Sequence, residues 1–304
     1  MSPSSYPKRD DLSLLLSSSS FHCSDEKKDL KAPVSPGKKS VYITIAFIVA
    51  FLALSERLHY NFITSQMDIH PILENITHRQ IIARHIGVDA FSCLVIAYIG
   101  YINRHILKEV LTTQRSEALD NNFHSRIYTY QPEGHRVLLF FLSYQVKNLY
   151  DSWYWNDGLL FIFHHIFAGF TAWLGMYPGT GSMYGLFFMG MSEISTCVLC
   201  LLANFDPQFG VSGLDEAFPN TKIALAAAFV VSFLICRIVL WPIFTYHFLF
   251  DCLKALKRDS VKETSKVKSA LVMMMISSVG LTILQFVWLG EIITTAREEI
   301  TALL

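Results

Sequence analysis

The chain has 304 residues, of which 52% are hydrophobic and only 16% are charged. Soluble domains carry about 25% charged residues, so the composition excludes an ordinary soluble protein, and the balanced net charge argues against a nucleic-acid partner. The hydrophobic residues gather in runs of about 20, the length that a helix needs to cross a bilayer core. The sequence therefore predicts an all-α fold, a polytopic membrane helix bundle with six or seven transmembrane helices.

Four regions follow one another along the chain. Residues 1–40 are rich in Ser, Lys, Asp and Pro and contain no classical signal peptide, so we expect a disordered basic tail. A first transmembrane helix and its loop are predicted over 41–81, and a larger transmembrane domain over 82–293. A short C-terminal tail is expected over 294–304.

Seven runs are candidate membrane spans. They cover roughly 41–60, 84–103, 137–155, 158–177, 182–203, 223–248 and 269–293. The second run carries Asp89, and polar residues interrupt the third. The turn "PGTG" after Tyr177 cannot continue a helix, so the fourth and fifth spans should form an antiparallel pair.

Basic residues are distributed unevenly between the connecting segments. Eighteen of the 25 Lys and Arg residues lie in the N-terminal tail and in the loops 103–136 and 251–268. Cytoplasmic segments of membrane proteins are enriched in these residues, so the pattern favours a cytoplasmic N-terminus. The sequon "NIT" at Asn75 would then be lumenal and is a glycosylation candidate.

Ionisable residues inside the predicted spans are costly and indicate function. His164 and His165 are adjacent in the fourth span, and consecutive helical residues point about 100° apart. At most one of them should therefore face the bundle squarely, while the other bonds a neighbouring helix. Glu193, in the middle of the fifth span, needs a partner or a proton, and Arg237 lies equally deep in the sixth span. A purely structural role, in which these groups only join helices, stays open.

Neighbouring spans carry further polar side chains. The candidates for binding a lipid or substrate are Arg237, Asn148, Thr196, Gln285 and Trp288. Lys147 and Asp151 are spaced i,i+4 and are predicted to form an ion pair. Zinc sites need three or four convergent ligands, which two adjacent histidines do not supply, so we predict no metal site and no permanently bound cofactor.

Four short segments carry a resemblance to a known family. The paired histidines in "FIFHHIF", "MSEIST" about 29 residues later, "FLICRI" and the closing "LQFVW" resemble a TLC (TRAM/Lag/CLN) domain over about Ile82 to Ile293. The resemblance is to TLC-domain-containing proteins rather than to ceramide synthases, whose HDxxD element is missing here. Glu193 and Thr196 stand near the positions of its two acids.

The resemblance implies a multi-pass protein of the endoplasmic reticulum that acts in membrane lipid homeostasis. It would bind or sense a lipid through a pocket formed by His164, His165 and Glu193. The alternative is a lipid acyltransferase with acyl-CoA as co-substrate, in which these three residues would be catalytic, one histidine acting as general base. A second alternative is a cargo receptor or translocation accessory. The expected partners are a membrane lipid and either a second copy of the chain or another membrane protein.

Overall fold

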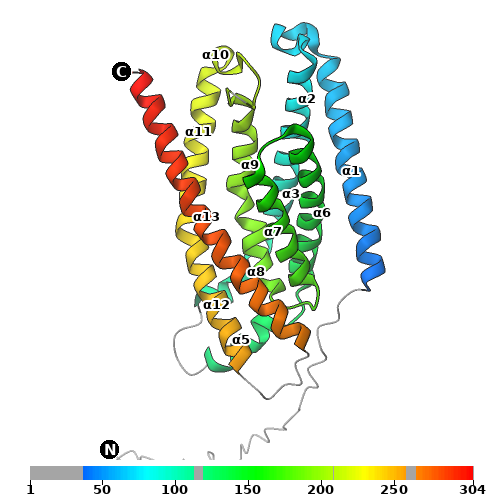
Figure 1. Cartoon of the computed structure of the whole chain (residues 1–304), viewed down its shortest axis with the longest axis vertical. Coiled ribbons are helices and arrows are strands. Elements are labelled where there is room, and N and C mark those ends of the chain that lie inside the picture. Colours follow the sequence, from blue (N-terminus) through cyan, green and yellow to red (C-terminus); the bar gives the residue numbers. More distant parts are fainter. Residues whose placement is uncertain (1–36, 113–118, 208, 258–264, 304) are drawn as a thin grey trace, which may run out of the picture. The chain divides into compact units, whose positions relative to one another are not determined.

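The computed structural model describes residues 37–112, 119–207, 209–257 and 265–303. These residues form helices and no strand, and six helical segments are long and apolar enough to cross a membrane (Figure 1). The predicted all-α polytopic membrane bundle is therefore confirmed. Almost all of the predicted basic tail, residues 1–36, lies outside the described residues.

The described N-terminal half of the bundle is built from two spans and four shorter helices. The elements are α1 (Lys38–Thr64), η2 (Met67–Ile69), η3 (Pro71–Glu74), α2 (Ile76–Arg84), η4 (His85–Ala90), α3 (Phe91–Ile102), α4 (Arg104–Thr112) and α5 (Leu119–Tyr128). The segments α2, η4 and α3 follow one another without a break and together make the second span.

The C-terminal half holds the remaining spans. The elements are α6 (Pro132–Trp155), α7 (Leu159–Met176), α8 (Ser182–Leu186), η5 (Phe187–Met191), α9 (Glu193–Leu202), η6 (Ala203–Phe205), α10 (Leu214–Ala217), α11 (Pro219–Phe233), η7 (Leu234–Leu240), α12 (Trp241–Lys257) and α13 (Ser265–Leu303). The predicted sixth span is thus one long helical segment that joins α11, η7 and α12.

Helix α6 is the seventh long helix, although it is not among the six most apolar segments. It packs against α1, α3 and α7 and buries polar side chains that include Gln145, Lys147 and Asn148. These side chains lower its hydropathy, in agreement with the predicted interruption of the third span. A polar helix is stable in this position because neighbouring helices shield it and supply hydrogen-bond partners.

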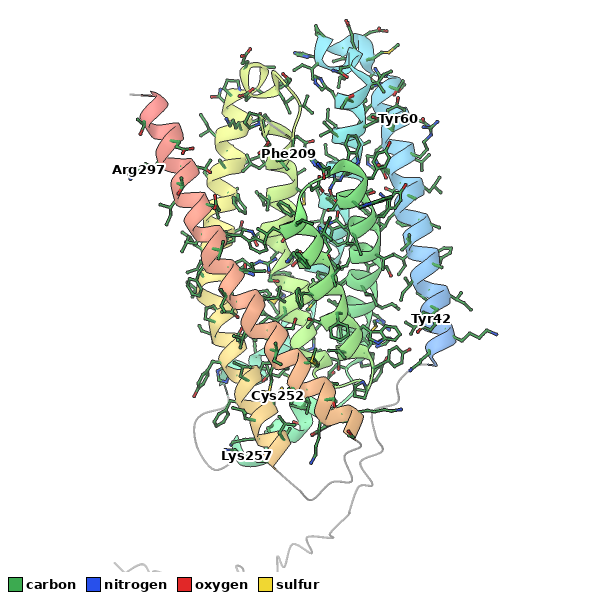
Figure 2. All side chains as sticks on the ribbon, in the orientation of Figure 1. Tyr42, Tyr60, Phe209, Cys252, Lys257 and Arg297 are labelled. Carbon is green, nitrogen blue, oxygen red and sulfur yellow. The ribbon has the colours of Figure 1, made fainter. Side chains whose placement is uncertain are left out.

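The bundle has two ends. Tyr42, Cys252 and Lys257 lie at one end, called here the Lys257 end, and Tyr60, Phe209 and Arg297 lie toward the other, the Phe209 end (Figure 2). Helix α1 begins at Lys38 and α13 continues to Leu303, so both are longer than the predicted spans 41–60 and 269–293. The flanking Lys, Arg and Glu residues are good helix formers and extend these helices beyond their apolar runs.

A close approach of two backbones fixes α9 against the second span. A Cβ atom added to Gly100 of α3 would lie 2.6 Å from the Met191 backbone nitrogen and 2.7 Å from the Leu186 carbonyl oxygen. Only glycine has no Cβ, so only glycine lets α3 and η5 come so close. This contact helps to set the position of Glu193, which follows η5 after Ser192.

A buried ion pair joins the elements at the Lys257 end. Arg126 of α5 donates two hydrogen bonds to the Asp251 carboxylate of α12, from Nε at 2.6 Å and from Nη2 at 2.7 Å. The hydroxyl of Tyr184 donates a third at 2.6 Å. The hydrogen bond with Asp251 raises the pKa of Arg126, so this guanidinium keeps its positive charge. It fastens α5 and α8 to α12.

Candidate functional site

Three π-helical segments interrupt the spans within the described residues, and each lies beside an ionisable group. They are η4, η5 and η7. Asp89 lies in η4, Glu193 follows η5, and Arg237 lies in η7. A π segment displaces side chains from the regular helical register and is frequent at functional sites. The charged side chains of the bundle interior therefore lie in or close to irregular helical segments.

Glu193 and Arg237 form the predicted buried pair. Nη2 of Arg237 donates to Glu193 Oε1 at 2.7 Å and to Thr196 Oγ1 at 2.8 Å, while its Nε donates to Ser195 Oγ at 3.2 Å. Only 5% of Glu193 and 7% of Arg237 are exposed. The guanidinium also lies 4.9 Å from the centre of the Trp241 ring, which favours a cation. The pair carries no net charge, and contacts of Arg237 with Ser195, Thr196 and Trp241 fix its position.

The second oxygen of Glu193 connects to a buried group of polar side chains. Cys93 Sγ lies 3.7 Å from Glu193 Oε2 and 3.8 Å from the Tyr144 hydroxyl oxygen. That hydroxyl accepts a hydrogen bond from Asn148 Nδ2 at 2.8 Å and donates to Asp89 Oδ1 at 3.4 Å. Asn148, a predicted binding residue, therefore lies in the same buried group as Glu193.

Arg84 and Lys147 form further ion pairs between the helices. Arg84 donates two hydrogen bonds to Asp157, the shorter at 2.5 Å from Nη2. Lys147 contacts Asp151 at 2.5 Å, which confirms that predicted pair, and it also contacts Glu56 of α1 at 2.8 Å. Arg84, Asp157 and Glu56 were not predicted as partners, because nothing in their local sequence marks contacts with residues 73 and 91 positions away.

The two histidines have different surroundings. Nδ1 of buried His165 forms a hydrogen bond of 2.7 Å with Gln145 Oε1 of α6. His164 is half-buried and packs edge-on against Trp288 of α13, with 5.2 Å between ring centres. One histidine thus bonds a neighbouring helix, as predicted. The Nδ1 atom of His164 is buried, and no described residue gives it a hydrogen-bond partner.

The histidines and Glu193 have different contacts: His165 bonds Gln145 and His164 packs on Trp288, whereas Glu193 bonds Arg237. Among the described residues, no hydrogen bond joins His164 or His165 to Glu193. Gln285 donates from Nε2 to the Leu281 carbonyl at 3.1 Å, while its Oε1 is buried and unpartnered in the described part of the chain. Sequence reasoning missed Gln145 and Tyr144, which α6 brings to the site.

Asn75 lies apart from these groups. It is exposed and caps α2, because its Oδ1 accepts a hydrogen bond from the Thr77 backbone N–H at 2.9 Å. Within the described residues, no set of three or more His, Cys, Asp or Glu side chains is placed to hold a metal ion.

A model of the TLC domain matches residues 85–294, more than half of the chain. The chain belongs to the TLC-domain family. The TLC domain contains both histidines, the Glu193–Arg237 pair, Asn148 and α13 up to residue 294, whereas α1 and Asn75 precede it. No curated protein and no solved structure matches the chain.

Proposed function

We propose that this TLC-domain protein binds a membrane lipid through the interior beside His164 and thereby acts in membrane lipid homeostasis. The observation that carries the proposal is the unpartnered, buried Nδ1 of His164 next to Trp288. A buried polar atom without a partner costs about 1–3 kcal/mol, so a ligand that forms this hydrogen bond stabilises the site. Ionisable groups at membrane depth commonly mark such ligand sites.

The hydrogen bonds of Glu193 support a role in shaping the pocket. One oxygen accepts from Arg237, and the other faces the Cys93 thiol. A carboxylate held in this way is poorly placed to attack a thioester, because attack would break its pair with Arg237 inside the bundle. Glu193 and Arg237 instead hold α9 against η7.

The acyltransferase function is the second candidate, and the same His164 atom favours it. A free ring nitrogen can take the proton from a lipid hydroxyl or amine while that group attacks the thioester carbonyl of acyl-CoA. The acyl–oxygen or acyl–nitrogen bond forms and the thioester bond breaks. The leaving sulfur takes the proton from the histidine, so coenzyme A leaves as the free thiol. The two candidates differ in whether a new lipid is made.

One experiment separates these functions. Cells lacking the endogenous protein would express the wild type, His164→Ala, His165→Ala or Glu193→Ala at matched levels and receive labelled fatty acid. Exposed His105 of α4 supplies the control His105→Ala. Lipid binding predicts that a lipid co-purifies with the wild type and the control, that His164→Ala loses it, and that no labelled product depends on the protein.

A labelled lipid made by the wild type and not by His164→Ala would establish the acyltransferase and replace the binding proposal. A His164→Ala protein that is folded and retains the co-purified lipid would overturn both. We further place the protein in the endoplasmic reticulum with its Lys257 end in the cytoplasm, in keeping with the exposed cations Arg104, Arg136 and Lys257 at that end.

A further inference from the structure

Gln145 continues a row of apolar contacts between α6 and α7. A Cβ atom added to Gly175 of α7 would lie 3.0 Å from Leu138 Cδ1. One added to Gly169, a single turn after His165, would lie 3.4 Å from Leu142 Cδ1 and 3.5 Å from Gln145 Cβ. Leu138, Leu142 and Gln145 follow one another at spacings of four and three residues and so share one face of α6. The two helices are therefore close together where Gln145 lies.

An amide in this row is costly unless it is hydrogen-bonded. Only 4% of Gln145 is exposed, and its hydrogen bond within the described residues joins Oε1 to His165 Nδ1 at 2.7 Å. A methionine would fill a similar volume with no polar group to remove from water. The amide therefore has a role beyond apolar packing, and its contact with His165 indicates what that role is.

The amide oxygen decides which ring nitrogen of His165 carries the proton. An amide oxygen can only accept a hydrogen bond, so Nδ1 of His165 must be the donor. A neutral imidazole has a single N–H, and its other nitrogen, Nε2, then presents a lone pair. Within the described residues Nε2 forms no hydrogen bond, and it is not enclosed as His164 Nδ1 is. Nε2 is therefore able to accept a hydrogen bond from a ligand.

The two histidine rings are neighbours but are not equivalent. Their centres are 5.4 Å apart and the rings meet edge-on, so a ligand that contacts the His164 ring also lies near the His165 ring. The protein supplies a hydrogen-bond partner to Nδ1 of His165, whereas it supplies none to Nδ1 of His164 among the described residues. Only His165 therefore has its tautomer fixed by a contact in the described structure.

We propose that Gln145 is a positioning residue that holds the proton of His165 on Nδ1 and so keeps Nε2 as a hydrogen-bond acceptor for the bound lipid. The inference rests on the lipid-binding function proposed above and adds an atom that contacts the lipid. The same arrangement serves the acyltransferase candidate, because a general base must offer a lone pair and not an N–H.

The first measurement reads the tautomer directly. The full chain, with nitrogen-15 in its histidines, would be studied by magic-angle-spinning NMR in phosphatidylcholine proteoliposomes at mildly alkaline pH, where histidine rings are neutral. Protonated and unprotonated ring nitrogens have well-separated shifts, and the His165 signals are those that His165→Asn removes. We expect the wild type to hold the proton on Nδ1. Gln145→Met fills the space without an acceptor and should give both tautomers.

The second measurement connects the tautomer to the lipid. Lipid that co-purifies with each variant would be quantified by mass spectrometry before reconstitution. Gln145→Met should retain on the order of fivefold less lipid than the wild type, the loss of about one hydrogen bond. Gln145→Glu again offers an acceptor oxygen to Nδ1, as carboxylates do for catalytic histidines, so it should recover both the tautomer and the lipid. A role of Gln145 in helix packing alone does not predict this recovery, because a buried carboxylate packs no better than methionine.

A matched control lies on the same face of α6. Leu142→Met changes the contact with Gly169 with little change in volume, and it should leave the tautomer and the lipid as in the wild type. Circular dichroism would confirm that each variant is helical. The wild-type tautomer can be read without any change at Gln145, so the inference remains falsifiable even where Gln145→Met does not fold.

The outcomes distinguish this inference from the proposed function. A proton on Nε2 of wild-type His165, an unchanged tautomer in folded Gln145→Met, or full retention of lipid by a Gln145→Met protein that has lost the Nδ1 tautomer overturns the positioning role and leaves lipid binding intact. A wild-type protein that co-purifies no lipid overturns the proposed function, and the role of Gln145 in it, even where the tautomer is the expected one.

Discussion

Replacing Arg237 with methionine would leave the Glu193 carboxylate in the interior of the bundle without its cation. The two groups are 2.7 Å apart, and each side chain is less than 10% exposed. At that separation their Coulomb attraction is about 6 kcal/mol for an effective dielectric constant of about 20, although much of it offsets the cost of burying two charges. Removing one partner of a buried pair typically costs about 3–5 kcal/mol. We expect Arg237→Met to destabilise the protein by that amount.

The double variant Glu193→Gln with Arg237→Met supplies the decisive comparison. It removes both charges, so its destabilisation should fall short of the sum of the single changes by about 2 kcal/mol. Unfolding would be followed by circular dichroism during SDS titration in mixed micelles. Arg297→Met, at the exposed end of α13, is the matched control and should lie within about 0.5 kcal/mol of the wild type. A cost below about 1 kcal/mol for Arg237→Met, or strict additivity of the two changes, would refute the buried ion pair.

Two further predictions concern topology and packing. In cells with a secretory pathway, the full chain should carry a glycan on exposed Asn75 that glycosidase removes and Thr77→Ala prevents; a glycan that survives Thr77→Ala would contradict the assignment. Gly100→Ala should cost about 1–3 kcal/mol in the same unfolding assay, because its Cβ would lie 2.6 Å from the Met191 nitrogen of η5 and 2.7 Å from the Leu186 carbonyl oxygen of α8. Gly280→Ala has open space around its Cβ and should not destabilise, so equal effects of the two changes would contradict the close approach of α3 and η5.

The helices and their order could be predicted because apolar runs and turn residues are local signals. The Glu193–Arg237 pair could be predicted as well, since a carboxylate at membrane depth needs a partner and the next span offered one cation at similar depth. The Lys147–Asp151 pair followed from i,i+4 spacing alone. In each case the physical requirement was visible within one helix or between neighbouring spans.

The contacts that the sequence did not reveal join distant segments or depend on helix irregularity. Arg84 and Asp157 are 73 residues apart in the sequence, and they come into contact only when the bundle is assembled. The π segments η4, η5 and η7 shift the helical register, and nothing in their local sequences marks that shift. Helical periodicity therefore showed that one histidine would bond a neighbouring helix, but not that its partner would be Gln145 of α6.

The hydrogen-bond partners of Glu193 and His164 determine which substitutions at these residues can test function. Glu193 is tied to Arg237, so Glu193→Ala removes helix packing together with any ligand contact, and a loss of lipid in that variant has two explanations. Glu193→Gln keeps an acceptor oxygen for Arg237 and tests the charge alone. His164, by contrast, has no protein partner at Nδ1 in the described structure, so His164→Ala removes little packing beyond its contact with Trp288. If His164 contacts the lipid, His164→Ala should lower the amount of co-purified lipid more than Glu193→Gln does. That difference would separate the residue that contacts the lipid from the ion pair that holds the helices.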